Sequence, residues 1–272
     1  MNMLARVPAC IPDAPAFQTV AVKWVRHWNE HLFSFAVERP TSFRFRSGEF
    51  VLLGLPGDAG KPLMRAYSIA SPAWADEIEF LSIKVPDGPL TSRLQAVHSG
   101  DQLYLGRKAT GTLVADALLG GRRLFLLSTG TGLAPYLSLA RDPEIYERFE
   151  EVVVVHSVRR VSDLAYHEAQ TALWAQDPLV GEAAAVRFHY VPTVTREAFH
   201  TTGRIGALLE AGTLFPLALA GPRTFDPESD RVMLCGSTAM IRDTARLLDQ
   251  RGFVEGSNAQ PGSYVIERAF VD

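Results

Sequence analysis

Cysteine is scarce in this chain of 272 residues, which contains only Cys10 and Cys235. Two thiols are too few for a disulfide framework, and a cysteine-ligated iron–sulfur cluster needs four. The chain therefore carries no such cluster of its own. The low cysteine content is typical of proteins from a reducing compartment.

Long apolar runs and clusters of one charge are also absent. No stretch reaches the roughly 20 apolar residues that span a membrane. Residues 1–17 are interrupted by Pro8, Pro12 and Pro15 and lack the apolar core of a signal peptide. The formal net charge is -3 and no lysine- or arginine-rich run occurs, so composition does not favour binding to nucleic acid or a membrane. We expect a soluble, cytoplasmic protein.

Two common catalytic signatures are missing as well. The sequence has no G-x-S-x-G nucleophile elbow, and its seven histidines show no spacing typical of a metal site. The sequence therefore indicates neither a serine hydrolase of this type nor a metal enzyme.

The first part of the sequence is rich in short strand-like segments. Turn residues separate six predicted strands: Thr19–Val25, Leu32–Glu38, Glu49–Leu55, Ala66–Ala70, Glu77–Ile83 and Gln102–Leu105. Six short strands at close spacing favour a small antiparallel β-barrel or sandwich. A helix predicted over Leu90–Val97 interrupts them. Its start at Thr91 and Ser92 could bind an anion through backbone N–H groups, or one of these side chains could simply cap the helix.

The pattern changes near residue 115. Continuous apolar runs at Arg123–Ser128 and Val152–His156 are typical of strands buried on both faces of a parallel sheet. Further strands are predicted at Phe188–Val191, Arg231–Leu234 and Val265–Glu267, and helices at Pro135–Ala140, Ser162–Trp174 and Thr238–Gln250. This alternation predicts an α/β domain with a parallel sheet. We divide the chain into a first domain of residues 1–112 and a second domain of residues 113–272.

Arg65-Ala66-Tyr67-Ser68 forms a short predicted strand with three kinds of functional group. Alternation places Tyr67 on the opposite face from Ala66 and Ser68. A planar redox cofactor could use the ring for stacking, the hydroxyl near its reactive nitrogen and the guanidinium for a phosphate. The simpler alternative is an edge strand whose arginine extends into solvent.

A strand, a glycine turn and a helix start follow one another between Leu124 and Pro135. The turn, Thr129-Gly130-Thr131-Gly132, would let backbone N–H groups approach a pyrophosphate. Pro135 stands at the third position of the usual dinucleotide fingerprint and suits a first helical turn. A purely structural turn would use the same glycines, but the position after the first apolar strand favours a nucleotide site.

Arginine follows the second strand of this domain, where an NAD site of the common type has an acidic residue. The run Glu151–Val158 leads into Arg159-Arg160, and further candidates lie downstream at Thr195, Arg196 and Arg204. Guanidinium groups can pair in a bidentate way with a 2′-phosphate. Each arginine alone could be an ordinary surface residue, but the set favours NADP(H).

Cys235-Gly236-Ser237 ends a predicted strand of the same domain. Open α/β sheets bind their ligands at this end of their strands. Taken alone, Cys235 could equally be a small buried apolar residue.

The motifs occur in the order seen in ferredoxin–NADP reductases, and the chain resembles the bacterial FAD-containing branch of that family over nearly its whole length. The matching segments are Arg65-Ala66-Tyr67-Ser68, the run from Ile83-Lys84-Val85 through Leu90 to Thr91-Ser92, the glycine turn and Cys235-Gly236-Ser237. The resemblance implies an N-terminal antiparallel β-barrel that binds FAD, followed by an α/β parallel-sheet domain that binds NADP(H).

The resemblance also implies roles on the flavin side. Tyr67 would stack on the isoalloxazine ring, Arg65 would reach the FAD pyrophosphate, and Ser68 would form a hydrogen bond near flavin N5. Thr91 and Ser92 would help to hold phosphate.

On the nicotinamide side, the resemblance implies that Cys235 lies beside the nicotinamide C4, with Glu267 as a carboxylate near that site. The residues that would grip the 2′-phosphate are Arg159, Thr195, Arg196 and Arg204.

The C-terminus departs from the plastid pattern of the family, which ends in an aromatic residue. Ala269 stands here instead, followed by Phe270-Val271-Asp272. Ala269 would occupy the catalytic region but is too small to stack on the flavin, and the tail would return to the cofactor with Phe270 on the FAD adenine. The alternative is a frayed tail.

We therefore expect a monomeric flavoenzyme that transfers hydride between NADP(H) and FAD, and single electrons between FAD and an external ferredoxin or flavodoxin. One alternative is the reductase component of an oxygenase, or a flavin reductase. Another is a flavin-binding electron-transfer subunit without NADPH turnover. Arg159, Arg196 and Arg204 disfavour the latter, since such a subunit does not need them.

Overall fold

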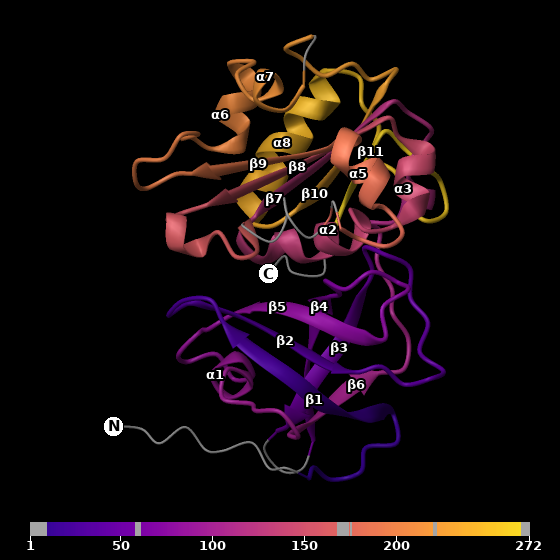
Figure 1. Ribbon diagram of the computed structural model, residues 1–272, viewed down its shortest axis with the longest axis vertical. Helices are drawn as coiled ribbons and strands as arrows, with labels where there is room; N and C mark the ends of the chain where they lie inside the picture. Colours follow the sequence, from indigo (N-terminus) through magenta and orange to yellow (C-terminus); the bar gives the residue numbers. More distant parts are fainter. Residues whose placement is uncertain (1–9, 58–60, 168–173, 175, 220–221, 268–272) are drawn as a thin grey trace.

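The chain folds into two domains, which the computed structural model in Figure 1 shows one above the other. The structure describes residues 10–57, 61–167, 174, 176–219 and 222–267. The N-terminal domain is an antiparallel β-barrel, and the C-terminal domain is a parallel sheet with helices on both faces. The predicted fold class is confirmed. None of the described helices combines the length and the apolar character of a membrane span.

Six strands form the barrel in the order β4–β3–β6–β1–β2–β5. Their bounds are Phe17–His27 (β1), Leu32–Glu38 (β2), Phe50–Pro56 (β3), Pro62–Ser68 (β4), Glu77–Ile83 (β5) and Gln102–Gly106 (β6). The two edge strands meet where Ile69, just after β4, bridges Phe80 of β5. The Ala70 N–H also donates to the Glu79 carbonyl, at 2.8 Å. These contacts close the sheet around a core of aliphatic and aromatic side chains.

Five strands form the parallel sheet in the order β11–β10–β7–β8–β9. Their bounds are Arg123–Thr129 (β7), Glu151–Val158 (β8), Phe188–Val194 (β9), Asp230–Cys235 (β10) and Tyr264–Ile266 (β11). The strand order reverses between β7 and β10. Their carboxyl ends therefore form the switch point at which open α/β sheets bind ligands.

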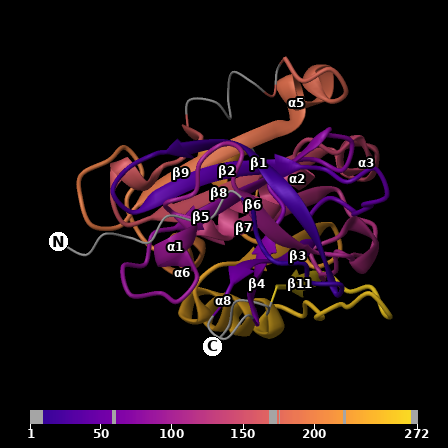
Figure 2. The ribbon, with the colours of Figure 1, turned by 90° about the horizontal axis from the view of Figure 1, so that it is seen from below.

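Helices cover both faces of this sheet, which explains why β7 and β8 are continuously apolar. One face carries α2 (Ala134–Leu139), α3 (Pro143–Arg148) and α5 (Gly181–Arg187), and the other carries α6 (Ile205–Glu210), α7 (Phe215–Ala218) and α8 (Thr238–Gln250). Along β7, Leu124 and Leu126 point to the first layer and Phe125 and Leu127 to the second. Figure 2 shows α5 and α8 on opposite sides of the molecule.

An apolar layer joins the two domains. Leu32, Ala70 and Leu81 of the barrel belong to the same buried cluster as Leu133 and Ala134 at the start of α2. In Figure 1, α2 lies on the side of the upper domain that faces the barrel. Separating the domains would expose this apolar surface to water, so the layer fixes their relative placement.

A partly buried chain of hydrogen bonds lies beside the apolar layer. The Trp28 indole N–H donates to Ser34 Oγ (2.7 Å), and Ser34 in turn contacts the Tyr166 hydroxyl (2.5 Å). Tyr166 donates to Glu79 Oε1 at 2.5 Å. Burial raises the pKa of the Glu79 carboxyl. Tyr166 has a φ of 64°, which is uncommon for a bulky residue, so these interdomain contacts stabilise a strained backbone.

Two predicted helices differ from the structure. The helix predicted over Leu90–Val97 is reduced to α1 (Thr91–Leu94). After α1, the Ala96 and Val97 N–H groups bond to carbonyls three residues back, and the chain turns at Gly100, where φ is 93°. This tighter hydrogen-bonding pattern ends the α-helix early.

The helix predicted over Ser162–Trp174 does not begin at Ser162. A 3₁₀ turn, η4, spans Val161–Asp163, and the Ser162 carbonyl accepts a hydrogen bond from Asn29 Nδ2 of the barrel (2.6 Å). The contact with the other domain overrides the local signal. Residues 168–173 of the predicted helix lie outside the described residues.

Short elements account for the other differences. Helices α3, α5, α6 and α7 were not predicted, because four to seven residues are too few to show helical periodicity. Strand β4 begins at Pro62 rather than Ala66, since the whole of β3 supplies partners for it. Thr110 pairs with Phe50 of the barrel and Leu113 joins the second domain's core. The boundary that we propose between residues 112 and 113 lies between these two contacts.

A buried ion pair gives a test of the parallel sheet. Arg123 of β7 holds Asp230 of β10 through two hydrogen bonds of 2.6 Å, and the aspartate side chain is fully buried. Arg123→Ala should lower the free energy of unfolding by about 3–5 kcal/mol, because it leaves a buried charge unpaired. The control is Arg122→Ala, since its ion pair with Glu150 is exposed and should contribute little. Equal denaturation midpoints for the two variants would contradict this account.

Candidate functional site

Two of the predicted motifs meet at the switch point of the parallel sheet. Thr129 Oγ1, at the end of β7, accepts a hydrogen bond from the Ser237 N–H after β10 (2.7 Å). A Cβ atom on Gly236 would lie 2.1 Å from Thr129 Oγ1, and one on Gly132 would lie 2.4 Å from the Cys235 carbonyl oxygen. Both positions therefore require glycine, because the two loops pack against each other.

The two glycines of the turn have different roles. Gly130 has a φ of 55°, and a Cβ built on it meets no atom within 4 Å. This part of the turn is therefore open to an approaching ligand, whereas Gly132 serves the packing against Cys235. The 3₁₀ turn η3 (Gly130–Leu133) leads directly into α2, with Pro135 in its first turn.

A buried histidine that the sequence analysis did not single out holds this turn. His156 of β8 is 1% exposed, and its Nε2 lies 3.1 Å from the Gly130 carbonyl oxygen. Its Nδ1 lies 3.0 Å from the Tyr190 hydroxyl. Burial lowers the pKa of His156 to about 4, so the ring is neutral at physiological pH. A polar residue at the end of an otherwise apolar run was the signal for it.

Cys235 and Glu267 lie close together at the carboxyl ends of β10 and β11. The pKa of the Cys235 thiol is raised by burial and by the nearby Glu267 carboxylate. The pKa of Tyr136 from α2 is also raised, by burial and by the neighbouring Cys235 and Glu267. The Thr112 N–H donates to Glu267 Oε2 at 3.4 Å. The thiol is therefore protonated at physiological pH and acts as a small apolar group rather than a nucleophile.

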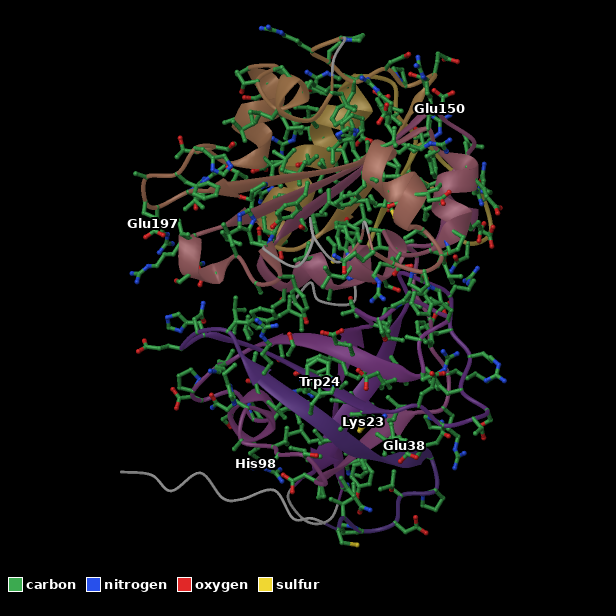
Figure 3. The ribbon with its side chains drawn as sticks, viewed as in Figure 1. Lys23, Trp24, Glu38, His98, Glu150 and Glu197 are labelled. Carbon is green, nitrogen blue, oxygen red and sulfur yellow. The ribbon has the colours of Figure 1, made fainter. Side chains whose placement is uncertain are left out.

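The predicted 2′-phosphate residues gather after β8 and β9. The Thr195 N–H and hydroxyl both donate to the Val158 carbonyl (3.0 and 3.1 Å), and the Arg196 N–H donates to the Arg159 carbonyl (3.0 Å). Glu197 accepts from the Val161 N–H, which further joins these loops. Figure 3 shows Glu197 at one end of the upper domain and Glu150, which precedes β8, at the other.

Arg204 completes this group. It is the N-cap residue of α6, and the preceding Gly203 N–H donates to the Val194 carbonyl at the end of β9 (3.3 Å). The side chains of Arg159, Arg196 and Arg204 are exposed. Among the described residues, none of the three forms an ion pair. Three guanidinium groups are thus available to an anion at this edge.

The barrel presents the predicted flavin motif on β4. Tyr67 is 8% exposed and packs edge-on to Phe35 and Phe80, with its hydroxyl 3.3 Å from Ser82 Oγ. Burial raises the pKa of Tyr67, which favours the neutral phenol. Ser68 follows it and is also buried. Arg65 is exposed, and its Nη1 donates to the neighbouring Met64 carbonyl (2.8 Å).

Ile83, Lys84 and Val85, at the end of β5 and just after it, have different environments. Ile83 and Val85 are large apolar residues that remain 45% and 37% exposed, as a surface for a flat ligand would require. Lys84 is used elsewhere: its Nζ donates to the Asn29 carbonyl (2.6 Å) and its N–H to the His31 carbonyl (2.7 Å). It stabilises the turn between β1 and β2.

The anion site predicted at the start of the helix near Thr91 stays a prediction, whereas the capping role considered for Thr91 and Ser92 is wrong. Helix α1 has four residues, and its N-cap is the buried Leu90 without a side-chain cap. The Ser92 N–H already donates to the Gly88 carbonyl (3.1 Å). Thr91 Oγ1 donates to the Val85 carbonyl (3.4 Å), so neither Thr91 nor Ser92 caps the helix.

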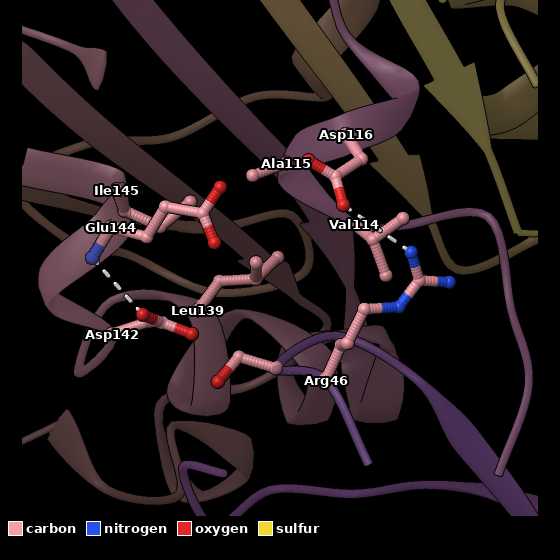
Figure 4. A pocket seen from close by; sticks show the side chains of 9 residues that line it. Arg46, Val114, Ala115, Asp116, Leu139, Asp142, Glu144 and Ile145 are labelled. Atoms are coloured by element: carbon pink, nitrogen blue, oxygen red, sulfur yellow. Dashed lines mark hydrogen bonds and ion pairs between the residues drawn. The ribbon is translucent and has the colours of Figure 1, made fainter. Parts of the chain in front are cut away.

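Other candidate sites are weaker. The cavity in Figure 4, lined by Arg46, Asp116, Asp142 and Glu144 among others, has a volume of only about 20 Å³, far too small for a nucleotide. It contains none of the predicted site residues. Within the ranges that the structure covers, no group of three or more His, Cys, Asp or Glu could hold a metal ion. Ala269 and Phe270 lie outside the described residues, so their roles stay predictions.

Comparisons with known proteins agree with this geometry. Residues 19–109 match the model of the oxidoreductase FAD-binding domain, and residues 126–246 match that of the oxidoreductase NAD-binding domain. The chain is 52% identical to the flavodoxin/ferredoxin–NADP reductase of Rhodobacter capsulatus, over 96% of this chain and 94% of that protein. It is 51% identical to the ferredoxin–NADP reductase of Azotobacter vinelandii, over 91% and 95%.

A solved structure shows the same fold. The crystal structure of a ferredoxin–NADP⁺ reductase from Neisseria gonorrhoeae, with bound FAD and NADP, matches with a TM-score of 0.83 and 33% identity over 93% of this chain and 99% of that one. The barrel and the parallel sheet thus define a two-domain oxidoreductase with FAD- and NAD(P)-binding domains. Within that class, the chain belongs to the ferredoxin/flavodoxin–NADP reductase family.

The buried thiol gives a test of the switch point. Cys235→Ala should lower the rate of hydride transfer by about 10–100-fold, because a small displacement of reacting atoms is costly. FAD content and melting temperature should stay close to those of the parent. The parent rate should show no thiol titration near pH 9, since the raised pKa keeps Cys235 protonated there.

The control for this variant is Cys10→Ala, because Cys10 is the other cysteine and is exposed. A Cys235→Ala protein with the parental rate but a much lower melting temperature would mean that Cys235 only fills the core.

Proposed function

We propose that this chain is an FAD-dependent reductase that exchanges hydride with NADP(H) and single electrons with ferredoxin or flavodoxin. The observation that carries the proposal is the meeting of two half-sites across the apolar layer. Ala70 lies two residues after Ser68, and Leu133 directly follows Gly132; both are buried in that layer. The flavin motif and the nucleotide turn therefore face a common interface.

The residues of the barrel fit a flavin nucleotide. Tyr67 offers an aromatic ring at the end of β4, Ile83 and Val85 offer exposed apolar surface, and Arg65 offers a guanidinium for phosphate. Bound FAD supplies the chemistry that couples a two-electron hydride donor to a one-electron carrier. The role of the barrel residues is to bind and orient it.

The residues of the parallel sheet fit NADP(H). The open turn at Gly130 suits a pyrophosphate, and the exposed guanidinium groups of Arg159, Arg196 and Arg204 suit a 2′-phosphate. Cys235 and Glu267 would lie beside the nicotinamide. The protonated thiol offers a small contact surface there, which positions the ring without competing chemistry.

The electron carrier lies outside this chain, because two cysteines cannot hold an iron–sulfur cluster. The relatives from Rhodobacter capsulatus and Azotobacter vinelandii are named for flavodoxin and ferredoxin, or for ferredoxin alone. We propose the same carriers here, together with a monomeric state and a cytoplasmic location.

The function is tested by NADPH-driven cytochrome c reduction, with and without a purified ferredoxin or flavodoxin. We expect the carrier to raise the rate strongly, and the FAD released on denaturation to be stoichiometric with protein. Rapid reduction of free flavin with no carrier dependence would instead indicate a flavin reductase. A bound flavin that NADPH does not reduce would indicate an electron-transfer subunit.

Cofactor choice is tested at Arg196. Arg196→Ala should weaken NADPH binding by about 1.5–3 kcal/mol, the usual contribution of a hydrogen bond to a charged group. NADH binding should barely change, because NADH lacks the 2′-phosphate. Arg122→Ala is a matched control, as this exposed arginine precedes β7 at the amino ends of the strands, whereas Arg196 follows the carboxyl end of β9. Equal losses for NADPH and NADH would show that Arg196 supports the fold instead.

A further inference from the structure

His156 occupies an unusual position in the parallel sheet. It is a polar side chain in an apolar central strand, is almost fully buried, and contacts the nucleotide turn rather than solvent. The Gly130 carbonyl oxygen can only accept a hydrogen bond, so His156 Nε2 carries the proton. Because the ring is neutral, Nδ1 then accepts the hydrogen bond of the Tyr190 hydroxyl. The ring orientation is thereby determined from both sides.

The consequence of this contact lies on the other side of the peptide. A planar trans peptide points its carbonyl and its N–H in opposite directions, and no described peptide bond of this chain is cis. With the Gly130 carbonyl held toward His156, the Thr131 N–H points away from the histidine. The turn is also open at Gly130 itself, where no atom lies within 4 Å of a built Cβ.

The turn needs such a restraint because it contains Gly130. Glycine adopts both signs of φ readily, and its value of 55° here belongs to the region that glycine tolerates best. Without the histidine, only the hydrogen bonds of the 3₁₀ turn η3 would oppose a rotation of this peptide that brings the Gly130 carbonyl toward the ligand. A carbonyl oxygen there would repel a phosphate, whereas an N–H group attracts it.

We infer that His156 is a positioning residue for the pyrophosphate of NADP(H). It holds the Gly130–Thr131 peptide in the orientation in which the Thr131 N–H points outward. This inference rests on the proposed function and deepens it. His156 does not touch the ligand. Its effect is confined to the pyrophosphate and is separate from that of the arginines on the 2′-phosphate.

Three substitutions separate the two hydrogen bonds of the ring. The side-chain amide nitrogen of glutamine reaches about as far as Nε2, and that of asparagine about as far as Nδ1. His156→Gln can therefore still donate to the Gly130 carbonyl, whereas His156→Asn retains only the contact toward Tyr190. His156→Leu removes both hydrogen bonds. FAD content and melting temperature are measured for each variant.

The test measures the dissociation constants of NADP⁺ and of 2′-AMP by calorimetry on the oxidised holoenzyme, without turnover. NADP⁺ should bind about tenfold more weakly to His156→Leu and His156→Asn, the effect of losing one hydrogen bond, and with nearly parental affinity to His156→Gln. All variants should bind 2′-AMP as the parent does, because 2′-AMP has no pyrophosphate.

The results distinguish a positioning role of His156 from a purely structural one. Parental NADP⁺ affinity in His156→Asn, or an equal loss for NADP⁺ and 2′-AMP, would overturn the inference and leave His156 as a residue of the core. If His156→Leu does not fold, the comparison of the glutamine and asparagine variants decides. A parent protein that does not bind NADP⁺ at all would defeat the proposed function itself, which is a different outcome from a loss confined to the variants.

Discussion

The apolar layer between the domains is the contact on which the rest of the site depends. Hydride transfer requires the reacting atoms to lie within about 3–3.5 Å, yet the proposed flavin and nicotinamide residues come from different domains. Ala70 and Leu81 of the barrel belong to the same buried cluster as Leu133 and Ala134. Ala70 lies close to the flavin motif in the sequence, and Leu133 directly follows the glycine turn. Each buried aliphatic side chain as large as leucine contributes about 1.5–3 kcal/mol, so a few of them can hold the domains together without a covalent constraint.

Apolar burial is not directional, however, and the domains also need a defined rotation. The hydrogen bonds from Trp28 through Ser34 and Tyr166 to Glu79 supply that direction. Tyr166 belongs to the loop that follows β8, and Arg159 is the first residue of that loop. The segment that docks on the barrel is therefore continuous with the segment proposed to bind the 2′-phosphate. The docking of the domains and the proposed binding of the 2′-phosphate therefore depend on the same loop.

Electrostatics divides the proposed site into a neutral centre and a cationic rim. At the centre, burial keeps His156, Cys235 and Tyr136 uncharged at physiological pH. Hydride transfer between two cofactors needs orientation more than proton transfer from the protein. The charges lie instead at the rim, where Arg159 and Arg196 are exposed. Solvated guanidinium groups carry no desolvation cost until an anion binds.

The sequence by itself determined the two-domain order, the barrel, the parallel sheet and the motifs at its strand ends. These depend on local period, turn chemistry and continuous apolar runs such as that of β8, which are legible in one dimension. Only the tertiary structure decided that Gly132 packs against the loop after β10 while Gly130 stays open to a ligand, since this depends on the contact between Gly132 and Cys235. It also brought His156 to Gly130. Contacts between distant segments set these features, and the local pattern does not specify which segments meet.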